Sequence, residues 1–196
     1  LSSEVAKYKD GSLLIAMLDP YNNRDLIDEL RNKNITTFAM EWMPRITRAQ
    51  SMDVLSSQSN LSGYKAVIEA SSNFNKAMPM MMTAAGTIAP AKVMVFGAGV
   101  AGLQAIATAK RLGAVVSATD VRLAAKEQVE SLGGKFVMVE SDELKDAETA
   151  GGYAKEMSED FKKQQAELIA STLSNQDIAI CTALIPGKKA PTLITE

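Results

Sequence analysis

Three glycines stand at the spacing G-x-G-x-x-G between an apolar run at residues 93–96 and a helical pattern at residues 100–112. In this strand–turn–helix context the first glycine permits a tight turn, and the second lets the backbone approach a pyrophosphate. The third lets the helix pack closely on the strand, and the N–H groups of the first helical turn attract the anion. The segment therefore predicts a dinucleotide site in a Rossmann-type fold. The candidate contacts are Gly97, Ala98, Gly99, Val100, Ala101 and Gly102.

Apolar runs and helical patterns continue to alternate after this segment. Three further strands are expected at residues 115–120, 136–139 and 178–183, with helices between them at residues 123–132 and about 158–173. This alternation predicts an α/β domain with a doubly wound parallel sheet. Four strands are fewer than the six that dinucleotide domains commonly have, so we expect the domain to be truncated at its C-terminus.

The N-terminal third has its own order of strand, helix and strand, at residues 11–18, 23–33 and 35–40. This order predicts one parallel crossover unit, which would belong to part of a second Rossmann-like domain.

A polar stretch at residues 45–60 comes next and leads into a helix with apolar residues at helical spacing. Glycine and proline in the Met-rich segment 77–90 then predict a loop that opens a new unit. We therefore expect residues 1–76 to form a partial first α/β domain with an interdomain helix. Residues 77–196 would form the nucleotide-binding domain.

An acidic residue, Asp120, ends the second strand of this domain, 18 residues after Gly102. That position matches the carboxylate expected on the adenosine ribose hydroxyls and favours NAD over NADP, since a carboxylate would repel a 2′-phosphate. Arg122, two residues later, keeps the phosphorylated cofactor open as an alternative. Further candidate contacts of the cofactor are Val121, Arg122, Thr182 and Ala183.

Composition excludes several other classes of function. A net charge of −2 and a pI of about 5.4 remove the main attraction for nucleic acid. The single Cys181 cannot form a disulfide within the chain, and with no histidine present we predict no metal site. The apolar run at residues 93–109 is too short to span a membrane comfortably.

Four blocks of the sequence resemble a known family. The first lies at residues 93–136 and includes GAGVAGLQAIATAKRLGAVVSATDVR and KEQVESLGGKF. The others are MPRITRAQSMDVLSSQSNLSGYKAV at 43–67, GGYAKEMS at 151–158 and the terminal TALIPGKKAPTLITE. All four are similar to the NAD(H)-binding α subunit of the Re/Si-specific, proton-translocating NAD(P) transhydrogenases, and the similarity extends over nearly the whole chain.

This resemblance implies an enzyme in which hydride passes directly between NAD(H) on this chain and NADP(H) on a separate partner domain. It also implies a membrane proton-channel domain in the same complex and a homodimer of this NAD(H)-binding component. The chain would then be a soluble domain of an inner-membrane complex that faces the bacterial cytoplasm or the mitochondrial matrix. It would lack the beginning of its first domain and the last strands of its second.

The resemblance also assigns residues beside the nicotinamide. Tyr153 matches the tip of a mobile loop that folds over bound nucleotide. A polar loop matches the family's catalytic group, and its members here are Arg45, Gln50, Asp53 and Ser56.

Two other classes of function remain open from the residues. Alanine dehydrogenase has a related two-domain architecture and a similar glycine motif, but it uses a catalytic histidine in its first domain. Residues 14–19, the corresponding region, contain none. Transfer between two nicotinamides removes no substrate proton, so a chain without histidine suits it better. The glycine motif alone is also compatible with a non-catalytic NAD-binding module.

Overall fold

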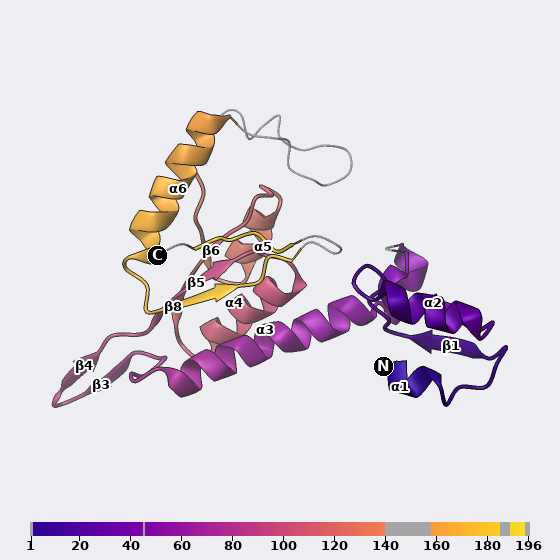
Figure 1. Cartoon of the computed structure of the whole chain (residues 1–196). Helices are drawn as coiled ribbons and strands as arrows, with labels where there is room; N and C mark the ends of the chain where they lie inside the picture. Colours follow the sequence, from indigo (N-terminus) through magenta and orange to yellow (C-terminus); the bar gives the residue numbers. More distant parts are fainter. Residues whose placement is uncertain (1, 45, 140–157, 185–188, 195–196) are drawn as a thin grey trace. The chain divides into compact units, whose positions relative to one another are not determined.

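The computed structural model describes residues 2–44, 46–139, 158–184 and 189–194 (Figure 1). Their contacts divide the chain into two compact units, the first running to Gln58 and the second comprising Ser59–Leu184. The division falls within helix α3 (Val54–Asn73), earlier than the boundary predicted between residues 76 and 77. The reason is that Val67 of α3 is 1% exposed in the core of the second unit.

The first unit contains one parallel crossover. Strand β1 (Leu13–Ala16) pairs with β2 (Thr36–Ala39), and α2 (Arg24–Asn32) connects them. Three shorter elements complete the unit, namely α1 (Ser2–Val5) and the 3-10 helices η1 (Met40–Trp42) and η2 (Thr47–Met52). One face of the two strands packs on α2 around a small core of Val5, Leu18, Leu26, Leu30 and Ile35.

Both strands of this crossover are shorter than expected from the sequence. Beyond β1 the chain turns at Asp19, whose φ is +47°. A carboxylate oxygen of Glu41 holds this turn by accepting the backbone N–H groups of Leu18, at 2.8 Å, and of Asp19. Residues 17 and 18 therefore lie outside the strand because their backbone leads into a turn fixed from η1.

The second unit is built on a parallel sheet of four strands in the order β7-β6-β5-β8. The strands are β5 (Lys92–Phe96), β6 (Val115–Thr119), β7 (Lys135–Phe136) and β8 (Ile178–Cys181). The helices that follow β5, β6 and β7 are α4 (Val100–Arg111), α5 (Ala125–Ser131) and α6 (Glu159–Leu173). The doubly wound α/β fold predicted from the sequence is thereby confirmed.

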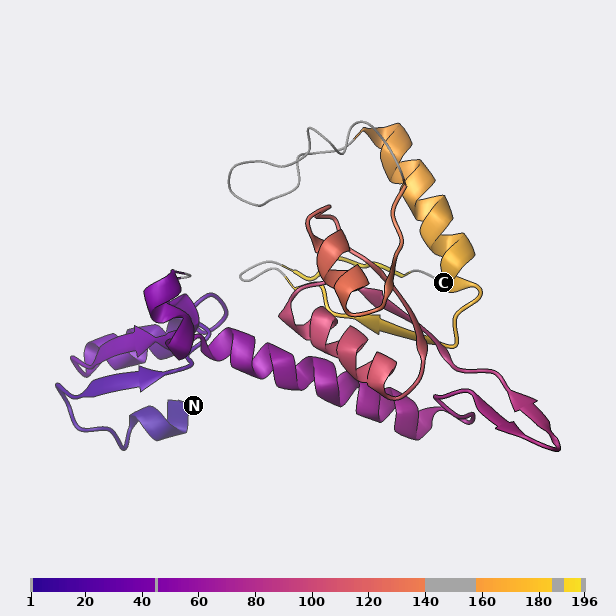
Figure 2. The same ribbon diagram turned by 180° about the vertical axis from the view of Figure 1, so that it is seen from behind.

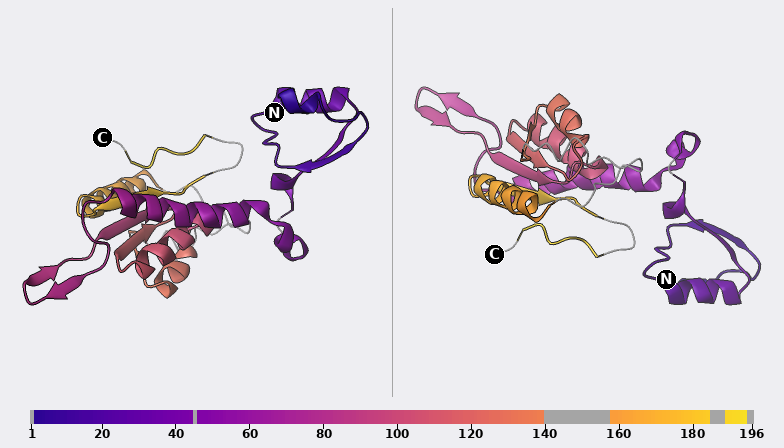
Figure 3. Two further views of the ribbon diagram at one scale, coloured as in Figure 1. Left: turned by 90° about the horizontal axis from the view of Figure 1, so that it is seen from below. Right: turned by 90° about the horizontal axis from the view of Figure 1, so that it is seen from above.

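Strand β5 shows why helices cover both faces of this sheet. Its residues are at most 2% exposed from Val93 to Phe96, and their side chains alternate between two cores. Val93 and Val95 pack with residues of α3, α4 and α5, whereas Met94 and Phe96 pack with α6 on the opposite face. Figure 3 shows α6 and α4 on different sides of the sheet. Each such burial stabilises the fold by about 1.5–3 kcal/mol.

The loop predicted for the whole of residues 77–90 is wrong in its central part. Strands β3 (Met81–Thr83) and β4 (Gly86–Ile88) form an antiparallel hairpin there, which projects from the second unit (Figure 2). Gly86 has a φ of +136°, which allows the tight connection between the strands. Glycine thus marks a hairpin turn within this segment rather than a continuous loop.

Candidate functional site

The glycine segment forms the turn between β5 and α4, as the sequence predicts. Gly97 adopts a φ of +95°, and its N–H donates to the carbonyl oxygen of Thr119 at 2.8 Å. A Cβ atom on Gly102 would lie 1.8 Å from the carbonyl oxygen of Gly97, so only glycine lets the helix lie this close to the turn. A Cβ on Gly99 would meet nothing within 4 Å.

The open space beside Gly99 adjoins the first turn of α4. Gly99 is the N-cap of this helix and supplies no side-chain hydrogen bond to its N–H groups. Uncapped N–H groups and the positive end of the helix dipole favour an anion at this position. The turn therefore fits a diphosphate, since the first turn of α4 offers backbone N–H groups and, among the described residues, no atom beyond the chain neighbours lies within 4 Å of the Cβ position of Gly99.

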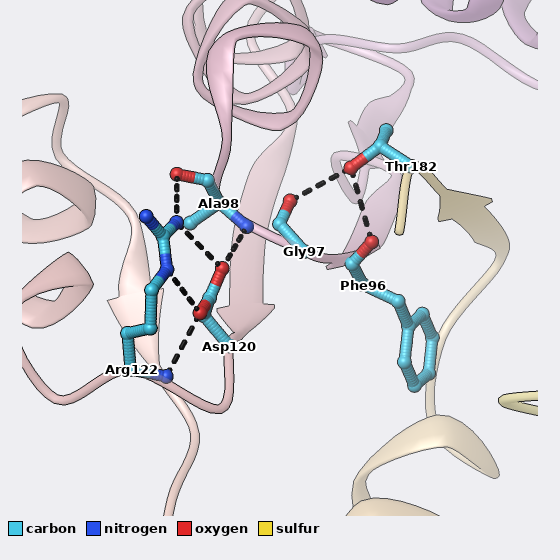
Figure 4. A network of polar contacts seen from close by, with 6 residues as sticks. All are labelled: Phe96, Gly97, Ala98, Asp120, Arg122 and Thr182. Atoms are coloured by element: carbon cyan, nitrogen blue, oxygen red, sulfur yellow. Dashed lines mark hydrogen bonds and ion pairs between the residues drawn. The ribbon is translucent and has the colours of Figure 1, made fainter. Parts of the chain in front are cut away.

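Asp120 joins the end of β6 to the glycine turn (Figure 4). One oxygen of its carboxylate, Oδ2, accepts the backbone N–H of Ala98 at 2.7 Å. The other, Oδ1, accepts the backbone N–H of Arg122 at 2.8 Å. The side chain of Asp120 is only 7% exposed. The carboxylate predicted to select the ribose is thus fixed in place beside the turn.

Arg122 binds the same carboxylate through its side chain. Its Nε lies 3.0 Å from Oδ1 of Asp120, and its Nη2 lies 3.1 Å from Oδ2. Nη2 also donates to the carbonyl oxygen of Ala98 at 3.4 Å. The structure therefore brings together three of the predicted contacts, Ala98, Asp120 and Arg122, in one network. Val121 lies between them in the chain and is 76% exposed.

The network keeps Asp120 ionised. Burial raises the pKa of its carboxyl group, but hydrogen bonds from the Arg122 side chain and from the N–H groups of Ala98 and Arg122 outweigh burial and hold the pKa below its usual value. A lowered pKa in the folded state means that this group stabilises the fold at neutral pH. The contribution disappears as the pH falls through that lowered value.

Thr182, which directly follows the neighbouring strand β8, supports the turn. Its hydroxyl lies 2.9 Å from the carbonyl oxygen of Gly97 and 3.1 Å from that of Phe96. A Cβ on Gly97 would lie 2.9 Å from this hydroxyl and 3.3 Å from the backbone nitrogen of Ala183. Thr182 and Ala183, both predicted as cofactor contacts, therefore pack against Gly97.

Thr182→Val is expected to lower the free energy of unfolding by about 1–2 kcal/mol, because the carbonyl of Gly97 loses its hydroxyl donor without a change in side-chain volume. Thr182→Ser keeps the hydroxyl and is the matched control, with an expected loss below about 1 kcal/mol. Urea unfolding of both variants in the full-length protein measures the difference. Equal losses in the two variants would show that the hydroxyl does not hold the turn.

Gly63 of α3 lies close to the backbone of Ala101, a contact that was not predicted from the sequence. It is buried, and a Cβ at this position would lie 2.0 Å from the carbonyl oxygen of Ala101. Helix α3 therefore lies directly against the first turn of α4, within the second unit. A glycine inside a helical run is the signal that could have indicated such a close approach.

Of the polar group predicted beside the nicotinamide, the three described members, Gln50, Asp53 and Ser56, belong to the first unit. Arg45 lies outside the described residues, and so does Tyr153. Gln50 is exposed on η2. Asp53 accepts the backbone N–H of Ser56 at 2.9 Å and its hydroxyl at 2.6 Å. These bonds place Asp53 and Ser56 together at the first turn of α3.

That pairing explains why α3 begins at Val54 and not after the polar stretch 45–60. A carboxylate directly before a helix accepts hydrogen bonds from N–H groups that have no partner within the helix. Asp53 therefore promotes helix formation in a stretch of polar residues.

In the part of the chain that the structure describes, no helix combines the length and the apolar character needed to cross a membrane.

The four-stranded parallel sheet and its glycine turn define a Rossmann-type, dinucleotide-binding class of domain. Comparison with models of protein families identifies the family. Residues 1–62 match the N-terminal domain of alanine dehydrogenase/PNT, and residues 66–196 match the C-terminal domain. The chain belongs to the alanine dehydrogenase/PNT family.

Relatives within the family differ widely in their similarity to the chain. An NAD(P) transhydrogenase subunit alpha protein of Rhodospirillum rubrum is 65% identical over 195 residues, which cover 100% of this chain and 51% of that protein. Alanine dehydrogenase 2 of Staphylococcus aureus is 27% identical over 200 residues, covering 100% of this chain and 47% of that protein. The chain spans about half the length of these relatives.

A solved structure agrees with the sequence comparison. The crystal structure of transhydrogenase from Sinorhizobium meliloti matches with a TM-score of 0.88 and 56% identity, over 99% of this chain and 51% of that one. The family predicted from the four sequence blocks is therefore confirmed.

Proposed function

We propose that this chain is the NAD(H)-binding component of a proton-translocating transhydrogenase. Hydride would pass directly between NAD(H) on this chain and NADP(H) on a separate domain. The observation that carries the proposal is the glycine turn with Asp120 fixed beside it, in a chain 65% identical to a transhydrogenase subunit alpha protein.

The residues of the turn fit the cofactor in two ways. The first turn of α4 offers backbone donors to the diphosphate across the open space at Gly99. Asp120 lies at the end of the neighbouring strand, where its ionised carboxylate can accept the ribose hydroxyls. A bound dihydronicotinamide supplies the hydride. Binding and orientation by the protein then suffice, because this transfer needs no general base. A chain without histidine is compatible with such a reaction.

The remaining features of the proposal follow from the family. Arg45, Gln50, Asp53 and Ser56 align the nicotinamide, and Tyr153 covers the bound nucleotide. The partners are an NADP(H)-binding domain, a membrane proton-channel domain and a second copy of this NAD(H)-binding component. In a complex with these partners, this chain would lie at an inner membrane and face the bacterial cytoplasm or the mitochondrial matrix.

Hydride exchange tests the proposal directly. The full-length protein is mixed with a separate NADP(H)-binding component, and reduction of an NADP analogue by NADH is followed spectroscopically. Exchange that needs both components is the expected result. NADH oxidation that depends on pyruvate and ammonia would instead indicate an alanine dehydrogenase, and NADH binding without exchange would indicate a non-catalytic module.

Asp120→Ala is expected to weaken NADH binding by about 1–2 kcal/mol, or roughly 5- to 30-fold, because charge-assisted hydrogen bonds to the ribose are lost. Titration calorimetry with NADH and NADPH on the full-length protein measures the change. The wild-type protein is expected to prefer NADH, and equal or tighter binding of NADPH would overturn the role given to Asp120.

Asp177 offers a matched control for this substitution. Its carboxylate accepts the backbone N–H of Lys92 at 2.9 Å and binds Lys76 Nζ at 3.2 Å, at the beginning of β5 and so at the opposite end of that strand from the glycine turn. Asp177→Ala removes a carboxylate with backbone contacts but should leave the affinity for NADH unchanged. A similar loss of affinity in both variants would point to a general effect of charge or stability.

A further inference from the structure

We propose that the guanidinium group of Arg122 occupies the two acceptor positions of Asp120 that the adenosine ribose requires, so that Arg122 must leave Asp120 before the ribose can bind. Arg122 thereby sets how strongly the site selects for ribose hydroxyls. The inference rests on the proposed NAD(H) site and specifies one step of binding there.

The carboxylate of Asp120 has no acceptor position left for a ribose hydroxyl. A carboxylate has about four lone-pair positions for hydrogen bonds. Oδ1 of Asp120 accepts from the backbone N–H and the Nε of Arg122, and Oδ2 accepts from the N–H of Ala98 and the Nη2 of Arg122. Each oxygen thus has two donors. A ribose hydroxyl can bind Asp120 only where one of these donors leaves.

The two backbone donors are the ones that stay. The N–H of Ala98 belongs to the glycine turn, and the N–H of Arg122 follows directly after β6, so neither can move far without disrupting the fold. They bind one oxygen each and hold the carboxylate in its orientation. Asp120 therefore keeps its position when the side chain of Arg122 is absent. The side chain of Arg122 thus competes with the ribose for Asp120 and is not needed to orient the carboxylate.

The side chain of Arg122 lies partly in solvent, and it donates to Asp120 in the same way as the ribose hydroxyls would. It is 44% exposed, and Val121 beside it is 76% exposed, so solvent is directly available to the displaced guanidinium. Nε and Nη2 donate to the two oxygens as a fork. A vicinal diol likewise presents two donors to one carboxylate. The fork thus fills both positions that the ribose 2′- and 3′-hydroxyls would take.

Competition for Asp120 predicts that removing Arg122 strengthens binding of the ribose, whereas charge alone predicts that it weakens binding of the nucleotide. Loss of a positive charge weakens the binding of any anionic nucleotide, whether or not the ligand has ribose hydroxyls. A suitable test therefore compares ADP with 2′,3′-dideoxy-ADP, because the two ligands carry the same charge and differ only in the hydroxyls. The quantity measured is the ratio of their dissociation constants, dideoxy-ADP over ADP.

The experiment uses calorimetric titration of the full-length protein with both ligands. Arg122→Ala is expected to raise the ratio about two- to fivefold, as for the loss of a partly exposed ion pair. Arg122→Lys keeps the charge but cannot form the fork, so its ratio should lie between those of the wild type and Arg122→Ala. In an Asp120→Ala background the ratio should be near one and insensitive to Arg122→Ala.

Three results would count against the inference. A ratio that falls in Arg122→Ala would show that Arg122 orients Asp120, and an unchanged ratio would show that the two do not compete. A change that persists without Asp120 would assign the effect to another group. If ADP binds to none of the proteins, the proposed nucleotide site itself is wrong, and that outcome is separate from the other three.

Discussion

Gly102→Ala is expected to destabilise the protein by about 3 kcal/mol and to weaken NADH binding about 100-fold or more. The added methyl group would lie 1.8 Å from the carbonyl oxygen of Gly97, a backbone atom that cannot rotate away. Either α4 moves from the sheet or the turn changes shape, and such overpacking costs about 1–3 kcal/mol or more. Both movements displace the donors to the diphosphate, each worth about 1.5–3 kcal/mol.

Gly99→Ala is the matched control, because it adds the same methyl group three residues earlier in the same turn. Gly99 has a φ of −77°, and its added Cβ would meet nothing within 4 Å. The free energy of unfolding should therefore stay within about 1 kcal/mol of the wild type. Binding of NADH should still fall, since the methyl group would stand where the diphosphate approaches the backbone.

Urea unfolding and titration calorimetry on the full-length variants separate the two effects. Gly102→Ala should lose stability and affinity together, whereas Gly99→Ala should lose affinity alone. Normal NADH binding by Gly99→Ala would exclude a diphosphate at this turn. A large loss of stability in Gly99→Ala would contradict the packing described for the first turn of α4.

Gln50→Asn is expected to slow hydride transfer far more than it weakens NADH binding. The substitution keeps the amide but withdraws it by one methylene group. Misplacing a nicotinamide by about 1 Å can lower the rate on the order of 100-fold. Losing one neutral hydrogen bond weakens binding by only about 0.5–1.5 kcal/mol. Rate and affinity should therefore separate if Gln50 aligns the ring.

Single-turnover transfer from NADH to an NADP analogue, in the reconstituted complex, gives the rate, and calorimetry gives the affinity. Gln58→Asn shortens an exposed amide in α3 and should change neither quantity. A parallel decrease of rate and affinity in Gln50→Asn, or no change in either, would remove Gln50 from the aligning group.

Local periodicity explains how much of the fold could be predicted. The sheet of the second unit follows from apolar runs of a strand's length that alternate with helical patterns, and the turn at Gly97 follows from the spacing of three glycines. These features depend on neighbouring residues. The hairpin β3–β4 was missed because Gly86 and Pro90 indicate a break in regular structure without indicating which kind.

Contacts between distant residues account for what the sequence could not show. The number of residues between the glycines and Asp120 was enough to assign Asp120 to the site. Its hydrogen bonds with Ala98 and Arg122 depend on the shape of the turn. The approach of Gly63 to Ala101 depends on how two helices pack, which no local pattern specifies. For the same reason, the sequence placed Thr182 near the cofactor but did not identify its bond to Gly97.

The hydrogen bond between Thr182 and Gly97 can form only some time after the glycine turn has been synthesised. It joins residues 85 positions apart, and Thr182 directly follows β8, which is synthesised after β5, β6 and β7. At about 5–20 residues per second, a ribosome needs roughly 4–17 s to proceed from Gly97 to Thr182. During that interval the glycine turn lacks its support from β8. The glycine turn of the nascent chain therefore gains its hydrogen bond from Thr182 only after β8 has been synthesised.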